Sequence, residues 1–320
     1  MDPAITLAEE LTGLHVDVRG AEHLGPAIRE HRPWSVRVWD ADQKLELPMG
    51  SEVVGVLILE CPNLSVIQCA CRLDSLQRLW ISDCPLSSLS FVHDMPVLES
   101  LSTDRSVITT LDDLIDHDHI RTLFLPNTTA TDFFGIAKLP KLSSLNVLNT
   151  GCSSLEGLLE GKPMQILSIA RTPITSLRGL DCTQEIFSLS VADCHIDNMH
   201  SVEGARSLEY LSMRGTRCPD YRFLATLPVL ADLELAGSNI AQLDVLADCD
   251  CLWSLSVRGT VVPTLLPLVP IESLLFVRIS PDMEQLSGVT ELKERGVHVM
   301  VETYPNRRDR KGFRNGSWTY

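Results

Sequence analysis

The 320-residue sequence lacks any long hydrophobic run and any leader segment that we can identify. No stretch approaches the roughly 18 uncharged apolar residues that a membrane-spanning helix requires. The first residues also lack the basic region and the continuous apolar core of a signal peptide. We therefore expect a cytoplasmic protein that has no contact with a membrane.

Positive charge is scarce as well, since 27 Lys and Arg stand against 42 Asp and Glu, a formal net charge of -15. This excess opposes broad attraction to nucleic acids and anionic membranes, so we expect neither as a partner. The sequence also has no P-loop, glycine-rich dinucleotide motif, nucleophile elbow or H-E-x-x-H motif. These absences predict a protein that is not an enzyme and that holds no cofactor and no metal.

What the sequence does have is an internal repeat of 22 residues. Segments of the form L-x-x-L-x-L recur, and their first residue, position 1 of each repeat, stands at 76, 98, 120, 142, 164, 186, 208, 230 and 252. Positions 4 and 6 fall on one side of a strand, and the later apolar spacing of three fits a turn of α- or 3₁₀-helix. We extend the phase back to Val54 and, after a shortened step of 19, forward to Ile271, which gives about eleven units.

One such unit cannot bury enough apolar surface to fold alone, so neighbouring units must stack and pair their strands. The motif L-x-x-L-x-L-x-x-(T/C/S)-x-(I/L/V) at this period resembles the leucine-rich repeat superfamily, and its length is similar to that of the bacterial internalin-like class. The resemblance implies an α/β fold, a right-handed leucine-rich repeat solenoid with a parallel β-sheet on its concave face and short helices or 3₁₀ turns on its convex face. At position 9 the superfamily usually has Asn, whereas this chain has Thr, Ser or Cys, whose hydroxyls we expect to satisfy loop amides.

The N-terminal segment differs from the regular repeats and predicts a cap, because a stack with open ends would expose its core. Residues 1–53 contain strand-like segments at 14–18 and 36–40, which are 22 residues apart, with a helix between them. We interpret this segment as a cap of degenerate repeats that precedes the regular repeats of residues 54–279.

The C-terminal segment predicts a second cap. Residues 280–302 contain a helical pattern ended by Gly296, followed by a last strand. The basic and aromatic tail at 303–320 is either an extension of this cap or an arm that docks onto RNA or an acidic partner.

Cysteine and histidine clusters are the candidates for a metal site. The pairs Cys69/Cys71 and Cys249/Cys251 lie about eight units apart, which is roughly 40 Å at the strand spacing of ~4.8 Å, so one zinc ion cannot reach both. We expect structural, reduced thiols instead. For the His-Asp-His segment that begins at His117 we expect a solvated convex loop rather than half of a metal site.

The side chains at positions 3, 5, 7 and 8 should project from the strands away from the core. At position 5 large residues such as Ile58, Trp80 and Phe124 come early and serines come late, before a final Leu275. Aromatic side chains exposed on a sheet often anchor a partner, unless a loop of the cap covers them. The predicted partner-binding residues are Arg78, Trp80, Asp104, Arg105, Phe124, Asn146, Arg171, Tyr210, Arg214, Glu234 and Arg258.

These positions predict a non-catalytic scaffold that binds a protein or peptide partner on its concave face. In this reading Trp80 and Phe124 hold an apolar patch of the partner. Its register is set by Arg78, Arg171, Tyr210, Arg214 and Arg258, and Arg171, Arg214 and Arg258 could also cradle an acidic or phosphorylated segment. The alternative is a ligand-sensing or regulatory subunit that recognises an anionic or glycan ligand on the half rich in Ser and Arg. A third interpretation is an accessory protein whose tail docks onto a separate enzyme.

Overall fold

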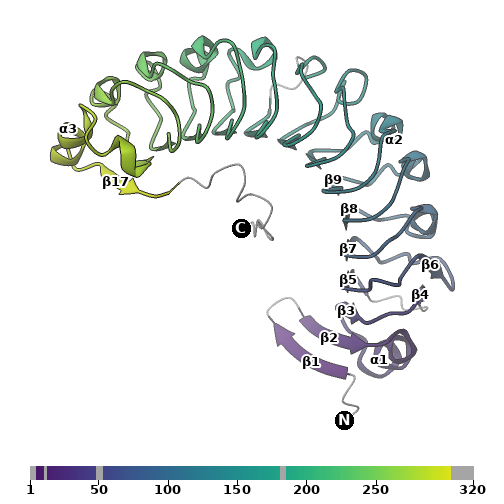
Figure 1. Cartoon of the computed structure of the whole chain (residues 1–320). Coiled ribbons are helices and arrows are strands. Elements are labelled where there is room, and N and C mark those ends of the chain that lie inside the picture. Colours follow the sequence, from purple (N-terminus) through teal and green to yellow (C-terminus); the bar gives the residue numbers. More distant parts are fainter. Residues whose placement is uncertain (1–4, 11–12, 48–52, 181–184, 304–320) are drawn as a thin grey trace.

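In the computed structural model the chain forms an arc whose inner surface is one long β-sheet (Figure 1). The structure describes residues 5–10, 13–47, 53–180 and 185–303. In spatial order the described strands of this sheet are β1 (Ile5–Glu10), β2 (Gly13–Arg19), β3 (Ser35–Trp39), β5 (Gly55–Leu59), β7 (Arg78–Ser82), β8 (Ser100–Asp104), β9 (Thr122–Phe124), β10 (Ser144–Asn146), β11 (Ile166–Ser168), β12 (Ser188–Ser190), β13 (Tyr210–Ser212), β14 (Asp232–Glu234), β15 (Ser254–Ser256), β16 (Phe276–Ile279) and β17 (His298–Val301).

The strands from β2 to β17 pair in parallel, and from β7 onward partner residues are 22 apart in the sequence. Leu123, Leu145 and Leu167, all at position 4, therefore stand side by side and are fully buried. Because every repeat contributes the same positions, the core is a continuous row of leucine, isoleucine and valine side chains along the arc. The predicted solenoid with a parallel concave sheet is confirmed.

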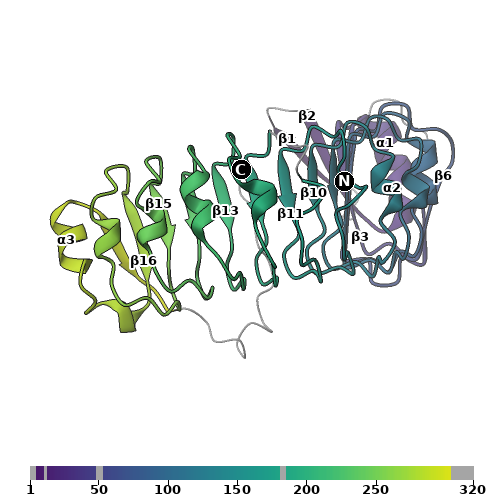
Figure 2. The same cartoon turned by 90° about the horizontal axis from the view of Figure 1, so that it is seen from above.

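Short helices and turns form the convex side, as expected (Figure 2). The described α-helices are α1 (Leu24–His31), α2 (Phe134–Ala137) and α3 (Val289–Glu294). The described 3₁₀-helices are η1 (Ala21–His23), η2 (Ser90–Asp94), η3 (Asp112–Leu114), η4 (His200–Val202), η5 (Arg222–Thr226), η6 (Asp244–Leu246), η7 (Leu266–Leu268) and η8 (Pro281–Met283).

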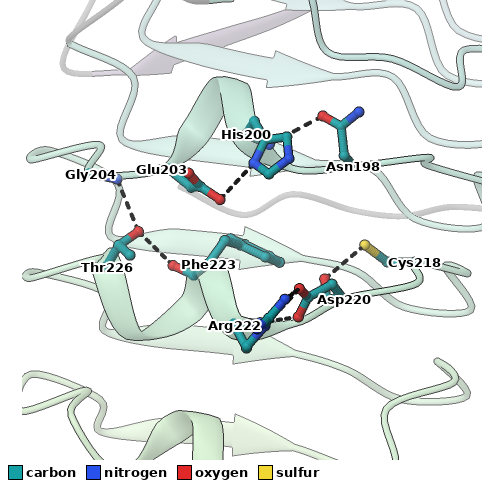
Figure 3. A network of polar contacts seen from close by, with 9 residues as sticks. All are labelled: Asn198, His200, Glu203, Gly204, Cys218, Asp220, Arg222, Phe223 and Thr226. Atoms are coloured by element: carbon teal, nitrogen blue, oxygen red, sulfur yellow. Dashed lines mark hydrogen bonds and ion pairs between the residues drawn. The ribbon is translucent and has the colours of Figure 1, made fainter.

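In eight repeats the convex turn begins at a polar residue in position 13, a feature that the sequence reading missed. The oxygen of Asn198 accepts the backbone N–H of His200 at 3.3 Å, and that of Asp220 accepts the backbone N–H of Arg222 at 2.9 Å (Figure 3). Six other repeats make the same bond from Ser88, Thr110, Asp132, Ser154, Ser176 and Thr264. Such side chains satisfy backbone donors that a short helix leaves open at its start.

Position 8, directly after each strand, requires left-handed backbone. Arg105, Asn127 and Arg171 have φ values of 56°, 57° and 56°, and glycine takes the position at Gly215 and Gly237. Asn and Gly adopt this conformation readily, whereas an arginine pays about 1–2 kcal/mol for it. The side chains of position 8 are therefore part of the turn that ends each strand.

The hydroxyls of position 9 act differently from what the sequence predicts. Thr128, Thr150 and Thr172 each donate to the backbone carbonyl three residues earlier, at 2.6–3.0 Å. Among these three threonines, only Thr150 also resembles the expected acceptor, in a longer contact of 3.4 Å with the Cys152 N–H. A hydroxyl differs from the usual Asn because its single proton best serves a carbonyl.

The predicted phase is wrong by one residue at the start of the repeats. Val56 of β5 lies opposite position 4 of the next repeat, so position 1 is Val53 and not Val54. Val56 and Ile58 are buried, and Leu57 faces the concave side in the row where we expected Ile58. A slip of one residue exchanges the two faces of a strand, and this strand is apolar on both faces.

The predicted step of 19 at the other end is also wrong. Val277 lies opposite Leu255 in the sheet, so position 1 is Leu274 and the period of 22 continues. Ile271 instead fills position 20, an inward position of the preceding repeat, and is buried. Leu275 therefore stands at position 2 and not at position 5.

The N-terminal segment contains the two expected strands, but their pairing differs from the prediction. Val16 of β2 lies opposite Val36 of β3, a separation of 20 residues and not 22. Strand β1 adds an antiparallel edge to β2, and β4 (Lys44–Leu47) pairs with β6 (Val66–Cys69) in a small second sheet, on the convex side in Figure 1. Neither feature was predicted. The division of the chain into caps and repeats stays a prediction, and the tail from residue 304 onward lies outside the described residues.

The packing of convex turns gives a stability prediction at a helical glycine. A Cβ on Gly135 in α2 would lie 1.9 Å from the carbonyl oxygen of Leu111 in the preceding turn. Although Ala normally favours a helix, we expect Gly135→Ala to lower the free energy of unfolding by about 1–3 kcal/mol, because the backbone must shift. Urea denaturation followed by circular dichroism measures the change.

Gly25 in α1 is the matched control for this prediction. A Cβ there would meet only the tip of the flexible Arg29 side chain, at 3.2 Å. Gly25→Ala should therefore leave stability unchanged or raise it by about 0.5–1 kcal/mol. Equal effects of the two substitutions would contradict the close packing of successive turns.

Candidate partner-binding face

The predicted binding residues all lie on the concave side of the arc, in the strands or just after them. Seven stand in strands, namely Arg78, Trp80, Asp104, Phe124, Asn146, Tyr210 and Glu234, and these are partly buried. The other four, Arg105, Arg171, Arg214 and Arg258, stand in the turns that follow strands, and Arg105 and Arg171 are exposed. Their placement agrees with the sequence reading, but their role in binding stays a prediction.

Aromatic side chains and one arginine gather at the N-terminal end of this face. The Cζ atom of Arg78 lies over the ring of Trp34, 4.3 Å from its centroid, and 5.9 Å from the ring centroid of Trp80. The ring of His15 meets Trp34 edge to face at 5.7 Å, and its Nδ1 lies 2.5 Å from the hydroxyl oxygen of Ser35. Trp80 therefore belongs to a connected cluster, which sequence spacing alone could not show.

A row of polar contacts crosses the middle of the face. Arg105 pairs with Asp83 and, at 3.2 Å, with Asp104, and the amide of Asn127 donates to Asp104 at 2.8 Å. Asn149 continues the row by donating to Asn127 at 2.9 Å. The charges of Asp104 and Arg105 are thus balanced within the protein, which weakens their candidacy as partner contacts. In the same region Asn146 holds its own turn, because its oxygen accepts the backbone N–H two residues later at 2.9 Å.

The C-terminal half of the face carries a second charge network. Arg258 lies between two carboxylates, 3.5 Å from Glu234 and 2.5 Å from Glu302, and only 19% of its side chain is exposed. Arg171 pairs with Asp193 at 3.3 Å. These arginines therefore have counter-charges already, which counts against the idea that they cradle an anionic ligand.

Tyr210 and its neighbours are partly buried in this half. Burial raises the pKa of Tyr210, whereas a hydrogen bond with Ser212 and the charge of Arg214 act in the opposite direction. Burial also raises the pKa of Asp232, although a hydrogen bond with Ser254 and the charge of Arg278 both act to lower it. The predicted residues Tyr210 and Arg214 thus belong to one packed polar cluster.

The sequence reading missed an apolar cluster at the last repeats. Trp253 and Leu275, both at position 2, are 43% and 51% exposed. The ring of Phe276 meets Trp253 edge to face at 5.8 Å and stacks on His298 at 5.4 Å. The signal was present, since large apolar residues stand at position 2 in successive repeats, but that position was not considered as a surface.

The cysteines support structural thiols in the part of the chain that the structure describes. Both C-x-C pairs consist of free cysteines, and within this part no three His, Cys, Asp or Glu residues are placed to hold a metal ion. Burial raises the pKa of Cys249 to about 11. At position 9, the thiols of Cys61 and Cys84 donate to the backbone carbonyls of Leu59 and Ser82, at 3.2 and 3.3 Å.

The predicted solvated loop at His117 is wrong for that residue. His117 is buried, its ring centroid lies 6.0 Å from that of His93, and burial lowers its pKa. The physical reason is the repeat phase, because His117 stands at position 20, where Met95, Leu139 and Leu227 fill the core of other repeats.

None of the helices within the described ranges is long and apolar enough to cross a bilayer. The cytoplasmic location stays a prediction from the sequence.

No protein-family model and no curated protein matches the sequence. Solved structures do match it. Internalin F of Listeria monocytogenes is 14% identical, covering 89% of this chain and 95% of that chain with a TM-score of 0.66. Internalin C2 of the same species is 21% identical, covering 58% of this chain and 83% of that chain with a TM-score of 0.55.

A third similar structure is the leucine-rich repeat ectodomain of the receptor kinase GASSHO1/SCHENGEN3 from Arabidopsis thaliana, in complex with CASPARIAN STRIP INTEGRITY FACTOR 2. It is 14% identical, covering 84% of this chain and 38% of that chain with a TM-score of 0.55. At these identities the likeness shows the fold alone. The chain has the leucine-rich repeat solenoid fold, and the predicted similarity to bacterial internalins is confirmed.

The network around Arg258 gives a prediction about stability. Arg258→Gln leaves Glu234 and Glu302 without their shared cation in a partly buried site. We expect the free energy of unfolding to fall by about 1–3 kcal/mol, because charged hydrogen bonds are lost and the partly buried carboxylate of Glu234 is left without its cation. Urea midpoints at low and high salt measure the effect, which should depend only weakly on salt.

Arg222 offers a matched control on the convex side. Its side chain is 84% exposed and pairs with Asp220 at 2.6 Å (Figure 3). Arg222→Gln should leave the urea midpoint almost unchanged, since an exposed pair contributes little. Equal losses of stability in the two variants would contradict the prediction that the network around Arg258 stabilises the fold more than an exposed ion pair does.

Proposed function

We propose that this chain is a non-catalytic scaffold that binds a protein or peptide segment on its concave face. The observation that carries the proposal is a row of large apolar side chains on that face. Leu57, Trp80 and Phe124 all stand at position 5, on strands β5, β7 and β9, with the small Ser102 between the two rings. The fold does not require apolar side chains on this side, because the core is already complete on the other side of the sheet.

The chemistry of these residues favours a macromolecular partner. Tryptophan and phenylalanine offer large, rigid contact areas at a low cost in side-chain entropy and are typical anchors of binding interfaces. Around them stand polar residues such as Ser100 and Asn146, which suits an apolar centre with a polar rim.

The comparisons support this class of function without identifying a partner. The ectodomain of GASSHO1/SCHENGEN3, which has a similar fold, was solved in complex with CASPARIAN STRIP INTEGRITY FACTOR 2. A fold by itself does not determine function, so the proposal rests on the apolar row. We favour it over the anionic-ligand alternative because Arg171 and Arg258 already pair with carboxylates.

The proposal predicts that peptide binding depends on the two aromatic anchors. A phage-displayed library of random linear peptides is selected on the purified full chain, and enriched sequences are synthesised and measured by fluorescence anisotropy. The double substitution Trp80→Ser and Phe124→Ser should weaken binding about a hundredfold, because anchor side chains dominate interface energies. Circular dichroism checks that the variant is folded.

Trp253→Ser is the control, since it removes an exposed tryptophan from the distant C-terminal cluster. It should leave peptide affinity unchanged. The proposal would be refuted if the double variant bound the selected peptides as tightly as the original chain, or if Trp253→Ser alone abolished binding.

A further inference from the structure

We propose that Arg78 receives the carboxylate of an Asp or Glu side chain in the bound segment. The inference rests on the proposed function and specifies the chemistry of the partner. The site consists of Trp34, Gly55, Arg78 and Trp80, which we call the Arg78 clamp.

The clamp is made possible by a missing side chain. In the sheet, Gly55 of β5 lies between Ser35 of β3 and Arg78 of β7, at position 3 of its repeat. Arg78 reaches across β5 to the ring of Trp34, and Gly55 places no side chain between the two. Gly55 is itself buried although it belongs to the concave face, which shows that neighbouring side chains cover it.

The fold does not require glycine at this place. The backbone of Gly55 is not left-handed, and a Cβ there would meet only the Cβ of Ser35, at an ordinary 3.4 Å. Neither backbone strain nor close packing of the backbone therefore explains the glycine, and its missing side chain leaves the space between Arg78 and Trp34 open.

The position of the guanidinium leaves its donors open. The Cζ atom of Arg78 lies over the Trp34 ring at 4.3 Å from its centroid, and a cation–π contact of this kind does not use up the N–H donors of the guanidinium. Within the described residues, Arg78 makes no ion pair and no hydrogen bond through its side chain. Two nearby arginines differ, since Arg37 pairs with Asp17 at 3.5 Å and Arg105 pairs with Asp83.

The charge of Arg78, which no described residue balances, fits one carboxylate. A single guanidinium offers two parallel N–H donors, which match the two oxygens of a carboxylate. Phosphate sites usually gather several cations, and the net charge of -15 opposes a dianion more strongly than a monoanion. Partly buried beside two indoles, the ion pair is also less screened by water than one on an open surface.

The surroundings of the clamp indicate an internal Asp or Glu rather than a chain end. The sheet continues past Arg78 on both sides, through β3 and β2 in one direction and through β8 and β9 in the other. A segment bound across the strands therefore passes over the clamp and reaches Phe124 two strands further on. Leu57 and Trp80 stand beside Arg78, so the acidic residue should have a large apolar neighbour in the segment.

The test uses the peptides selected on the full chain. We expect the enriched sequences to contain Asp or Glu next to a large apolar residue. For the tightest peptide, changing that Asp to Asn, or that Glu to Gln, should weaken binding by about tenfold, equivalent to about 1.4 kcal/mol. Arg78→Gln should cause the same loss for the acidic peptide and no further loss for the amide peptide.

Two variants make the test specific to the clamp. Gly55→Val fills the space that the Arg78 side chain crosses, and it should reproduce the loss of Arg78→Gln while the circular dichroism spectrum stays unchanged. Arg37→Gln removes a nearby arginine that already has a carboxylate partner and should leave the acidic preference intact.

The outcomes separate this inference from the proposed function. If the double variant of Trp80 and Phe124 loses binding but the acidic and amide peptides bind Arg78→Gln with their original difference, the scaffold stands and the clamp is refuted. Loss of binding on amidation of the peptide C-terminus would also overturn it, because a terminal carboxylate would then be the ligand. If no peptide binds the original chain, the proposed peptide function itself fails.

Discussion

The structure depends on one constraint, the stacking of identical positions in register along the arc. Leu123, Leu145 and Leu167 each cover the flank of the previous repeat, and the strand ladder fixes them side by side. No repeat could bury these side chains alone, so core and sheet form together. A slip of one residue would turn the core side chains into the concave face and the polar ones into the core.

Where the sequence repeats regularly, it predicts the strands and their inward and outward sides correctly. The strands from residue 76 to 258 and the side of each residue follow from the period, because polar and apolar residues alternate there. The reading failed at β5 and β16, where apolar residues fill both sides of the strand or stand at position 20 and offer two phases. Strands β1 and β4 precede the regular repeats, and β6 stands in the convex part of the first one, where the period predicts a helical turn, so periodicity gave no signal for them.

The candidate site shows the same limit. Contacts between neighbouring repeats join residues 22 apart, so the pairs Asp83–Arg105 and Arg171–Asp193 could have been read from the sequence. The contact of Trp34 with Arg78 could not, because it crosses the strand of Gly55 where the spacing of repeats is irregular. The most informative contacts of the face therefore lie where the repeat is least regular.

The arginines of the concave face fall into two groups, those that belong to turns and those that are available to a partner. Arg105 and Arg171 stand at position 8, where left-handed backbone costs each of them about 1–2 kcal/mol. Each also pairs with an acid of a neighbouring repeat, which offsets part of that cost and balances its charge. Arg78 stands at position 3 in ordinary strand backbone, and no turn needs it. Since the fold gives Arg78 two indoles but, among the described residues, no counter-charge, its charge is the one most open to a partner on the N-terminal half of the face.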